Sequence, residues 1–245
     1  MKKERIDNLL VEFGFATSLT KARALVMTGV VLVNEKRVEK PSDKFLRVIK
    51  VRIKGDSKAS KYVGRGGLKL EKALQEFQIR VNEYVCLDIG SSTGGFTDCL
   101  LQNSAKKVVA VDAGTNQIDW KLRTDARVEV RENTNARYLK PENFSEKFDL
   151  IVMDVSFISV TKILPAFREL LNQEGRIIVL IKPQFEVERT AVMKGGIVSD
   201  TAKHSEVIKK VNDFAVKIGL QVKGLIDSPI LGAEGNKEFL ALYEI

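Results

Sequence analysis

A glycine-bearing turn follows a short apolar strand in this sequence and could hold a nucleoside. It reads Leu87-Asp-Ile-Gly-Ser-Ser-Thr-Gly-Gly-Phe96. Glycine lets a backbone turn approach a ligand closely, and ligands of open α/β sheets bind beyond the carboxyl ends of the strands. Ser92 replaces a glycine of the dinucleotide-binding pattern, which argues against a bound pyrophosphate. The alternative is a turn that only closes a strand–helix corner. The candidate cofactor-binding residues here are Asp88, Gly90, Ser91, Gly94, Gly95 and Phe96.

Three further polar residues could contribute to the same site. Asp112 ends an apolar run at the place where an acid would meet the two hydroxyls of a ribose. Asn135 follows the next strand and could meet an adenine edge, although an asparagine-rich turn alone explains this segment more simply. Asp154 ends another apolar run and brings a second carboxylate to the edge of the sheet that holds Asp88. All three are candidate cofactor-binding residues.

A lysine closes a further apolar run in the sequence Val-Leu-Ile-Lys182-Pro-Gln-Phe185. The proline restricts the backbone beside the lysine. Burial at such a place can desolvate the ammonium and lower its pKa, which makes lysine usable as a general base. The alternative is a lysine whose charged end reaches water along its apolar stem. Lys182 is our candidate base.

Strands and helices that could position these residues alternate from residue 61 onward. Such alternation predicts a parallel, doubly wound sheet, whose strands deliver their carboxyl ends to one edge. The predicted strands are Tyr84–Ile89, Lys107–Val111, Val128–Arg131, Phe148–Met153, Arg176–Ile181, Leu220–Ile226 and Phe239–Tyr243, and the predicted helices are Leu68–Phe77, Gly95–Gln102, Val160–Leu171 and Thr201–Ile218.

The first 60 residues predict a separate, basic domain. Residues 1–70 hold 17 Lys and Arg against 7 Asp and Glu, whereas the whole chain has 40 against 32. A basic unit of this kind is typical of proteins that bind RNA phosphates, although the charge could also serve solubility alone. We expect a domain at 1–60, with a linker from about residue 54, and a second domain at 61–245. The predicted elements of the first are helices at Arg5–Phe13 and Lys21–Thr28 and strands at Val30–Val33, Arg37–Val38 and Phe45–Ile53.

Composition indicates an ordinary globular protein, with 44% hydrophobic and 29% charged residues. The first ten residues lack the apolar stretch of a signal peptide, and no window approaches the length of uncharged apolar sequence that spans a membrane, so we expect a cytoplasmic protein. Cys86 and Cys99 are not spaced as metal ligands, and we expect reduced thiols and no metal site.

The chain resembles the TlyA, or hemolysin A, family of rRNA 2′-O-methyltransferases over essentially its whole length. The N-terminal part resembles the S-four RNA-binding domain through Arg5-Ile-Asp7, Lys21-Ala-Arg23 and Gly29-Val-Val-Leu-Val-Asn34. The remainder resembles the FtsJ-like methyltransferase domain, whose turn D-x-G-x-x-x-G-G and following aromatic match Asp88 to Phe96. Thr93 departs from the proline that is frequent in the family and leaves the glycines intact.

This resemblance implies a Rossmann-like class I methyltransferase sheet, mostly parallel with an antiparallel last strand, behind a small α+β RNA-binding domain. It implies S-adenosylmethionine as cofactor and a catalytic tetrad of Lys69, Asp154, Lys182 and Glu238. In that tetrad Lys182 would take the proton of a ribose 2′-hydroxyl, while the two acids orient the amines. Taken singly, Lys69 and Glu238 could be an ordinary helix-face lysine and strand-edge glutamate.

The resemblance further implies that the substrate is a cytidine in ribosomal RNA or a ribosomal subunit. The chain ends soon after Glu238, which favours the shorter family form that modifies the large subunit. We expect a monomer. The candidate RNA-binding residues are Arg5, Lys21, Arg23, Lys36 and Arg37.

Three other functions explain these residues less well. A membrane-active hemolysin would leave the glycine turn and the tetrad unexplained. A non-catalytic, RNA-binding ribosome assembly factor would keep the fold without using the cofactor. A nicotinamide-dependent oxidoreductase is disfavoured by Ser92 in the glycine turn.

Overall fold

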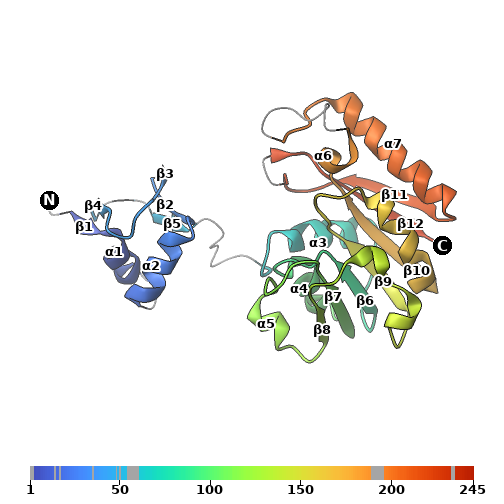
Figure 1. Ribbon diagram of the computed structural model, residues 1–245, viewed down its shortest axis with the longest axis horizontal. Coiled ribbons are helices and arrows are strands. Elements are labelled where there is room, and N and C mark those ends of the chain that lie inside the picture. The colour runs from blue at the N-terminus through green and yellow to red at the C-terminus, as the bar shows by residue number, and fades with distance from the viewer. Residues whose placement is uncertain are drawn as a thin grey trace. The chain divides into compact units, whose positions relative to one another are not determined.

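The computed structural model divides into two compact units, residues 1–60 and 61–245 (Figure 1). It describes residues 3–13, 15–16, 18–34, 36–47, 49, 51–53, 61–188, 196–232 and 235–245. The linker expected from about residue 54 therefore lies outside the described residues, apart from Lys61 at its end. None of the helices in these ranges has the length and apolar character that crossing a bilayer requires.

The N-terminal unit packs two helices against short strands. The helices are α1 (Ile6–Glu12) and α2 (Leu19–Met27), and Ser18 caps α2 by accepting a hydrogen bond of 3.3 Å from the backbone N–H of Lys21. Their apolar faces form a small core with the strand β2 (Val31–Val33). This core is built from Ile6, Leu9, Leu10, Ala22, Val26, Val31, Val33 and Val38.

The strands of this unit form two small sheets, so the continuous strand predicted at 45–53 is wrong. β1 (Glu4–Arg5) pairs antiparallel with β4 (Lys44–Phe45), while β2 pairs with both β3 (Lys36–Arg37) and β5 (Val51–Ile53). The apolar pattern predicted extended backbone but could not show that its two ends have different partners.

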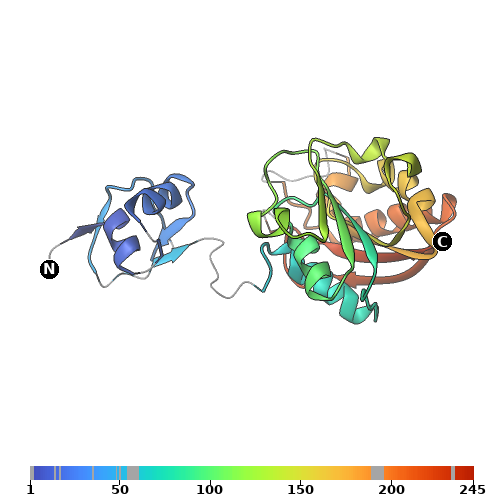
Figure 2. The same ribbon diagram turned by 90° about the horizontal axis from the view of Figure 1, so that it is seen from below.

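The second unit contains one seven-stranded sheet in the order β11-β12-β10-β9-β6-β7-β8 (Figures 1 and 2). Pairing is parallel from β10 through β8, and β12 runs antiparallel between β10 and β11. The predicted Rossmann-like sheet with an antiparallel last strand is thus confirmed. The strands are β6 (Val85–Ile89), β7 (Lys107–Val111), β8 (Val128–Arg131), β9 (Phe148–Met153), β10 (Leu171–Ile181), β11 (Gln221–Asp227) and β12 (Phe239–Glu244).

Helices cover both faces of this sheet because successive strand residues point to opposite sides. In β6, Cys86 packs with residues of α3 (Gly66–Glu76) and α4 (Gly95–Gln102), whereas Leu87 packs with residues of α7 (Thr201–Lys217) on the other face. Both cysteines are buried and free. These two apolar layers hold the strand ends rigidly in register.

The predicted helix at 160–171 is wrong in type. The structure has two 3₁₀ helices, η3 (Val160–Lys162) and η4 (Leu164–Leu170), and β10 begins at once at Leu171. Pro165 sits near the start of η4 and lacks the N–H that a continuous α-helix through 160–171 would use there. Four further short elements were not predicted, since each holds only one turn: α5 (Trp120–Arg123), η1 (Ala136–Tyr138), η2 (Pro141–Asn143) and α6 (Pro183–Glu186).

Candidate functional site

The glycine-bearing turn leaves β6 beside a buried acid. Asp88 is fully buried; its Oδ2 accepts a hydrogen bond of 2.6 Å from the hydroxyl of Thr97 in α4. The other oxygen, Oδ1, has no hydrogen-bond partner among the described residues. Burial raises the pKa of Asp88 to about 7, against the opposing hydrogen bond from Thr97, and the nearby carboxylate of Asp154 adds to the rise. Asp88 can therefore accept one more donor at this site.

Glycines allow the turn to lie against its neighbours. Gly90 has a φ of +81°, and a Cβ at this residue would lie 2.5 Å from the carbonyl oxygen of Asp154. A Cβ on Gly95 would lie 2.9 Å from the backbone nitrogen of Gly67, at the start of α3. A side chain at either position would push apart the elements that form the site. The other predicted turn residues are Gly94, with a φ of +96°, and the buried Ser91 and Phe96.

A cavity of about 480 Å³ lies beside this turn, and the predicted residues Asp112 and Asn135 both line it. The Asp112 carboxylate accepts hydrogen bonds from the backbone N–H groups of Ser92, at 2.8 Å, and Gly114, at 2.7 Å. These bonds fix it in the cavity wall. Asn135 caps η1 through its side-chain oxygen. The volume falls in the range of about 300–1,000 Å³ that is usual for cofactor sites.

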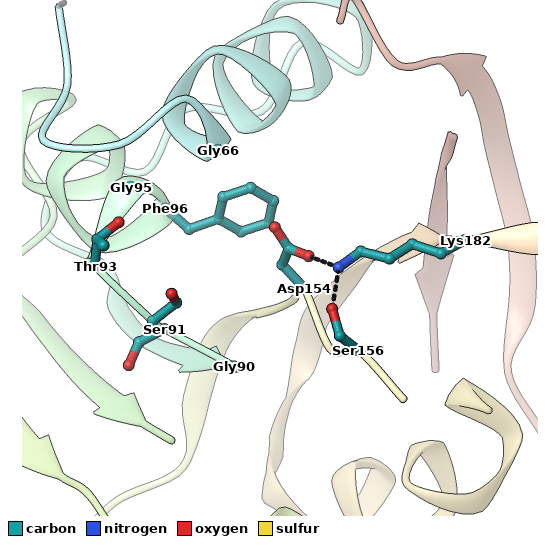
Figure 3. Close-up of a pocket in the computed structure, with 10 residues that line it drawn as sticks. Gly66, Gly90, Ser91, Thr93, Gly95, Phe96, Asp154, Ser156 and Lys182 are labelled. Carbon is teal, nitrogen blue, oxygen red and sulfur yellow. Dashed lines mark hydrogen bonds and ion pairs between the residues drawn. The ribbon is translucent and has the colours of Figure 1, made fainter. Parts of the chain in front are cut away.

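A second, smaller cavity of about 190 Å³ contains the candidate base (Figure 3). It shares Gly90, Ser92, Asp154 and Ser156 with the first cavity, so the two adjoin. Lys182 directs its Nζ to Asp154 Oδ1 at 2.6 Å and donates a hydrogen bond of 2.8 Å to Ser156 Oγ. The Lys182 side chain is only 11% exposed, so its amine lies at the wall of the crevice rather than in bulk water.

The other two predicted catalytic residues form a deeper ion pair. Lys69, in the first turn of α3, meets Glu238 at 2.6 Å, with side chains 10% and 2% exposed. Ile181 pairs with Phe239 at the end of the β10–β12 ladder, so Lys182 and Glu238 leave the sheet at the same edge. The structure thus resolves the predicted tetrad into two ion pairs at neighbouring strand ends, one buried (Lys69–Glu238) and one partly exposed (Lys182–Asp154).

Three residues that the sequence reasoning missed also belong to this site. Ser156 contacts Lys182, Thr97 holds Asp88, and Phe157 lines the larger cavity. Phe157 is 91% exposed and has a φ of +65°, a backbone conformation that bulky residues rarely adopt. Its ring centroid lies 5.1 Å from that of Phe185. The only available signal was the phenylalanine that follows Asp154-Val-Ser156 after β9, and in sequence it reads as a core residue.

In the N-terminal unit, a buried acid joins two of the predicted RNA-binding residues. Asp7 is fully buried. Its carboxylate accepts two hydrogen bonds from Arg5, at 2.8 and 2.9 Å, and one from Arg23, at 3.0 Å. The hydrogen bonds from Arg5 lower the pKa of Asp7 to about 2, because their effect outweighs burial, which would raise it. Both arginines remain partly exposed, at 39% and 56%. Lys21, Lys36 and Arg37 are also exposed.

Comparison with protein families identifies both units. Residues 62–244 match the FtsJ-like methyltransferase model, and residues 4–46 match the S4 (S-four) domain model. A solved structure of a hemolysin-type protein from Streptococcus thermophilus is 46% identical, with a TM-score of 0.75 over 100% of this chain and 89% of that one. An S-adenosylmethionine-dependent methyltransferase from Listeria monocytogenes, only 14% identical, has the same fold over 73% of this chain, with a TM-score of 0.54 and 98% of that chain covered.

Two curated relatives match nearly the whole chain. The 16S/23S rRNA (cytidine-2′-O)-methyltransferase TlyA of Mycobacterium tuberculosis is 39% identical over 97% of this chain and 88% of its own length. Hemolysin A of Brachyspira hyodysenteriae is 43% identical over 98% of this chain and 100% of its own length. With an S4 domain ahead of its FtsJ-like domain, this chain belongs to the TlyA and hemolysin A family of FtsJ-like methyltransferases.

Proposed function

We propose that this protein methylates the ribose 2′-hydroxyl of a cytidine in ribosomal RNA, with S-adenosylmethionine as methyl donor. The observation that carries the proposal is the position of Lys182, whose amine lies where a nucleoside-sized cavity adjoins a smaller polar one. The relative TlyA, which is named for this reaction, supports the choice of nucleotide.

The residues of the larger cavity fit the cofactor. Asp112 would accept hydrogen bonds from the two ribose hydroxyls, and Asn135 would lie near the adenine edge. Gly90 keeps the floor of the cavity free of a side chain, and the unpartnered oxygen of Asp88 can accept a donor. When bound, S-adenosylmethionine supplies a methyl group on a positively charged sulfur.

Lys182 would act as the general base. In its neutral form its Nζ takes the proton of the 2′-hydroxyl as that oxygen forms a bond to the methyl carbon and the carbon–sulfur bond breaks. Asp154 and Ser156 hold the amine in place from one side.

The buried pair of Lys69 and Glu238 would shape the other wall of the crevice. A Cβ on Gly232 would lie 2.0 Å from Glu238 Oε1, so the backbone at this glycine packs directly against the acid. Phe157 has an almost fully exposed ring beside Ser156, and such a ring can stack on a nucleobase that has left its helix. These features suit a flexible or unpaired target nucleotide.

The N-terminal unit would hold the RNA backbone. Arg5, Arg23, Lys21, Lys36 and Arg37 present cations that can replace the counterions of phosphates. We expect neutralisation of Lys21, Arg23, Lys36 and Arg37 together to weaken rRNA binding and to flatten its dependence on salt. Unchanged affinity would remove this unit as the anchor. The large subunit is our preferred substrate.

Ribose methylation of rRNA tests the proposal directly. Mass-spectrometric mapping should show one or more 2′-O-methylcytidines that disappear in a strain without this protein and return with the wild-type gene. The Lys182→Ala gene should not restore them. An identical methylation map with and without the protein would exclude the proposed reaction.

The name of one relative, hemolysin A, supports membrane lysis as a second candidate function. Lysis would not require the two ion pairs or the cofactor-sized cavity. Release of dye from liposomes, unaffected by S-adenosylmethionine and retained by Lys182→Ala, would favour this function over methylation.

A further inference from the structure

Two chain segments run side by side after neighbouring parallel strands and meet at both ends. Segment 154–160 follows β9, and segment 182–186 follows β10. At the near end Lys182 binds Asp154 and Ser156. At the far end Glu186 binds the segment again through Ser159 and Val160. The function proposed above uses the near end and leaves the far end without a role.

Glu186 makes the far contact with its whole carboxylate. Oε2 accepts a hydrogen bond of 2.6 Å from the Ser159 hydroxyl, and Oε1 accepts one of 2.7 Å from the backbone N–H of Val160. Glu186 is only 4% exposed. Its backbone oxygen accepts a further bond of 2.6 Å from Lys210 Nζ in α7. Burying a carboxylate is unfavourable unless its oxygens are satisfied, and here both are.

The far contact bears on Lys182 because the element between them is short. Helix α6 has only four residues and Lys182 is its N-cap, with extended backbone angles of −112° and 102°. One turn of helix cannot hold its own orientation, so its packing must do so. Between the two contacts, Phe157 keeps a positive φ that surrounding structure has to enforce.

We propose that Glu186 is a positioning residue, which holds α6 against residues 159–160 and thereby keeps Lys182 Nζ beside Asp154 and Ser156. This inference rests on the proposed role of Lys182. Burial raises the pKa of Glu186, and the two hydrogen bonds oppose that rise. The contacts themselves do not require a charge, because a protonated carboxyl or an amide still has an oxygen for the Val160 N–H and a donor for Ser159 Oγ.

Two substitutions in the full chain separate positioning from charge. Glu186→Gln keeps an oxygen for the Val160 N–H and an NH₂ group for Ser159 Oγ, so we expect kcat within about threefold of wild type. Glu186→Leu keeps the volume but loses both bonds, and we expect kcat to fall about 10- to 100-fold, with S-adenosylmethionine affinity unchanged, since misplacing a reacting group costs rate steeply. Glu188→Leu, at an exposed acid two residues later, is the matched control.

Crystal structures of the variants supply a readout that does not depend on activity. Lys182 Nζ should leave Asp154 in Glu186→Leu and stay in Glu186→Gln. A leucine variant with normal kcat and an unmoved Lys182, or a glutamine variant as slow as the leucine one, would overturn the proposal. Should Glu186→Leu fail to fold, Ser159→Ala removes one of the two bonds and should lower kcat severalfold; normal kcat there would also overturn it. If the wild-type protein did not methylate rRNA, the proposed function would be refuted. The crystal structures would still show whether Glu186 positions Lys182.

Discussion

Two fully buried aspartates, one in each unit, have opposite ionisation behaviour. Asp7 in the N-terminal unit accepts hydrogen bonds from two guanidinium groups, and its pKa is lowered to about 2. Asp88, beside the glycine-bearing turn, accepts one hydrogen bond from a neutral hydroxyl, and burial raises its pKa to about 7. Both carboxyls are shielded from solvent, yet their pKa values shift in opposite directions, because hydrogen bonds from two guanidinium groups outweigh desolvation at Asp7, whereas desolvation is the largest effect at Asp88.

The difference extends to the ion pairs of each unit. In the N-terminal unit a hidden acid holds arginines that stay partly exposed, which suits contact with a large polyanion. In the methyltransferase unit both lysines are themselves nearly buried against acids, which suits chemistry shielded from water. The arginines bound to Asp7 are thus displayed to solvent, whereas Lys69 and Lys182 are enclosed. The following experiments test this contrast, from the largest expected effect to the smallest.

Removing the enclosed cation Lys182 should slow methyl transfer strongly without affecting cofactor binding. We expect Lys182→Ala to lower the single-turnover rate of methyl transfer by about 10²- to 10⁴-fold, the usual contribution of a general base. Calorimetry should show S-adenosylmethionine binding as in wild type. Near-normal turnover in this variant would remove Lys182 from the mechanism.

Enclosed and displayed cations should differ in their contribution to stability. Lys69→Met leaves Glu238 buried and unpaired, and we expect it to lower the free energy of unfolding of its unit by about 3–5 kcal/mol. Arg23→Met removes a partly exposed partner while Arg5 still holds Asp7, so the loss should be about 1 kcal/mol or less. Urea unfolding followed by circular dichroism measures both. Equal losses would contradict the contrast.

Asp7 should aid RNA binding although it is negatively charged. Neutralising an acid in a basic domain normally strengthens binding to a polyanion. Asp7→Asn, however, loosens Arg5 and Arg23, and we expect rRNA affinity to fall by about threefold to tenfold, equivalent to about one hydrogen bond. Glu12→Gln makes the same charge change at an exposed acid and should not weaken binding. Tighter binding by Asp7→Asn would show that Asp7 does not orient the arginines.

The two aspartates should affect stability in different pH ranges. Asp7 has a lowered pKa, so its contribution is present above about pH 4 and is lost as the pH falls towards 2. Asp88 has a raised pKa, so its unit loses stability as the pH rises from about 4 to about 7. Relative to wild type, Asp88→Asn should therefore gain stability over that second range. Thermal unfolding across pH checks this, and parallel profiles for Asp88→Asn and wild type would contradict the raised pKa.

The sequence allowed the helix–strand order of the second unit to be predicted because its apolar periodicity is strong there. Short elements escaped, since α6 and the 3₁₀ helices have too few residues for a period to show, and Pro165 changed the type of a predicted helix. In the N-terminal unit, extended backbone was predicted at 45–53, but not its division between two sheets.

Residue types and local spacing were enough to single out the glycine turn, the strand-end acids and the lysine before Pro183. They also indicated a basic unit ahead of an α/β domain. What they left open was pairing, because Lys69 and Glu238 are brought within 2.6 Å only by α3 and the β10–β12 register. Ser156, Phe157 and Glu186 likewise acquire their surroundings from segments that neighbouring strands place together. Local patterns specify elements, whereas contacts between distant residues depend on how the strands are ordered and aligned.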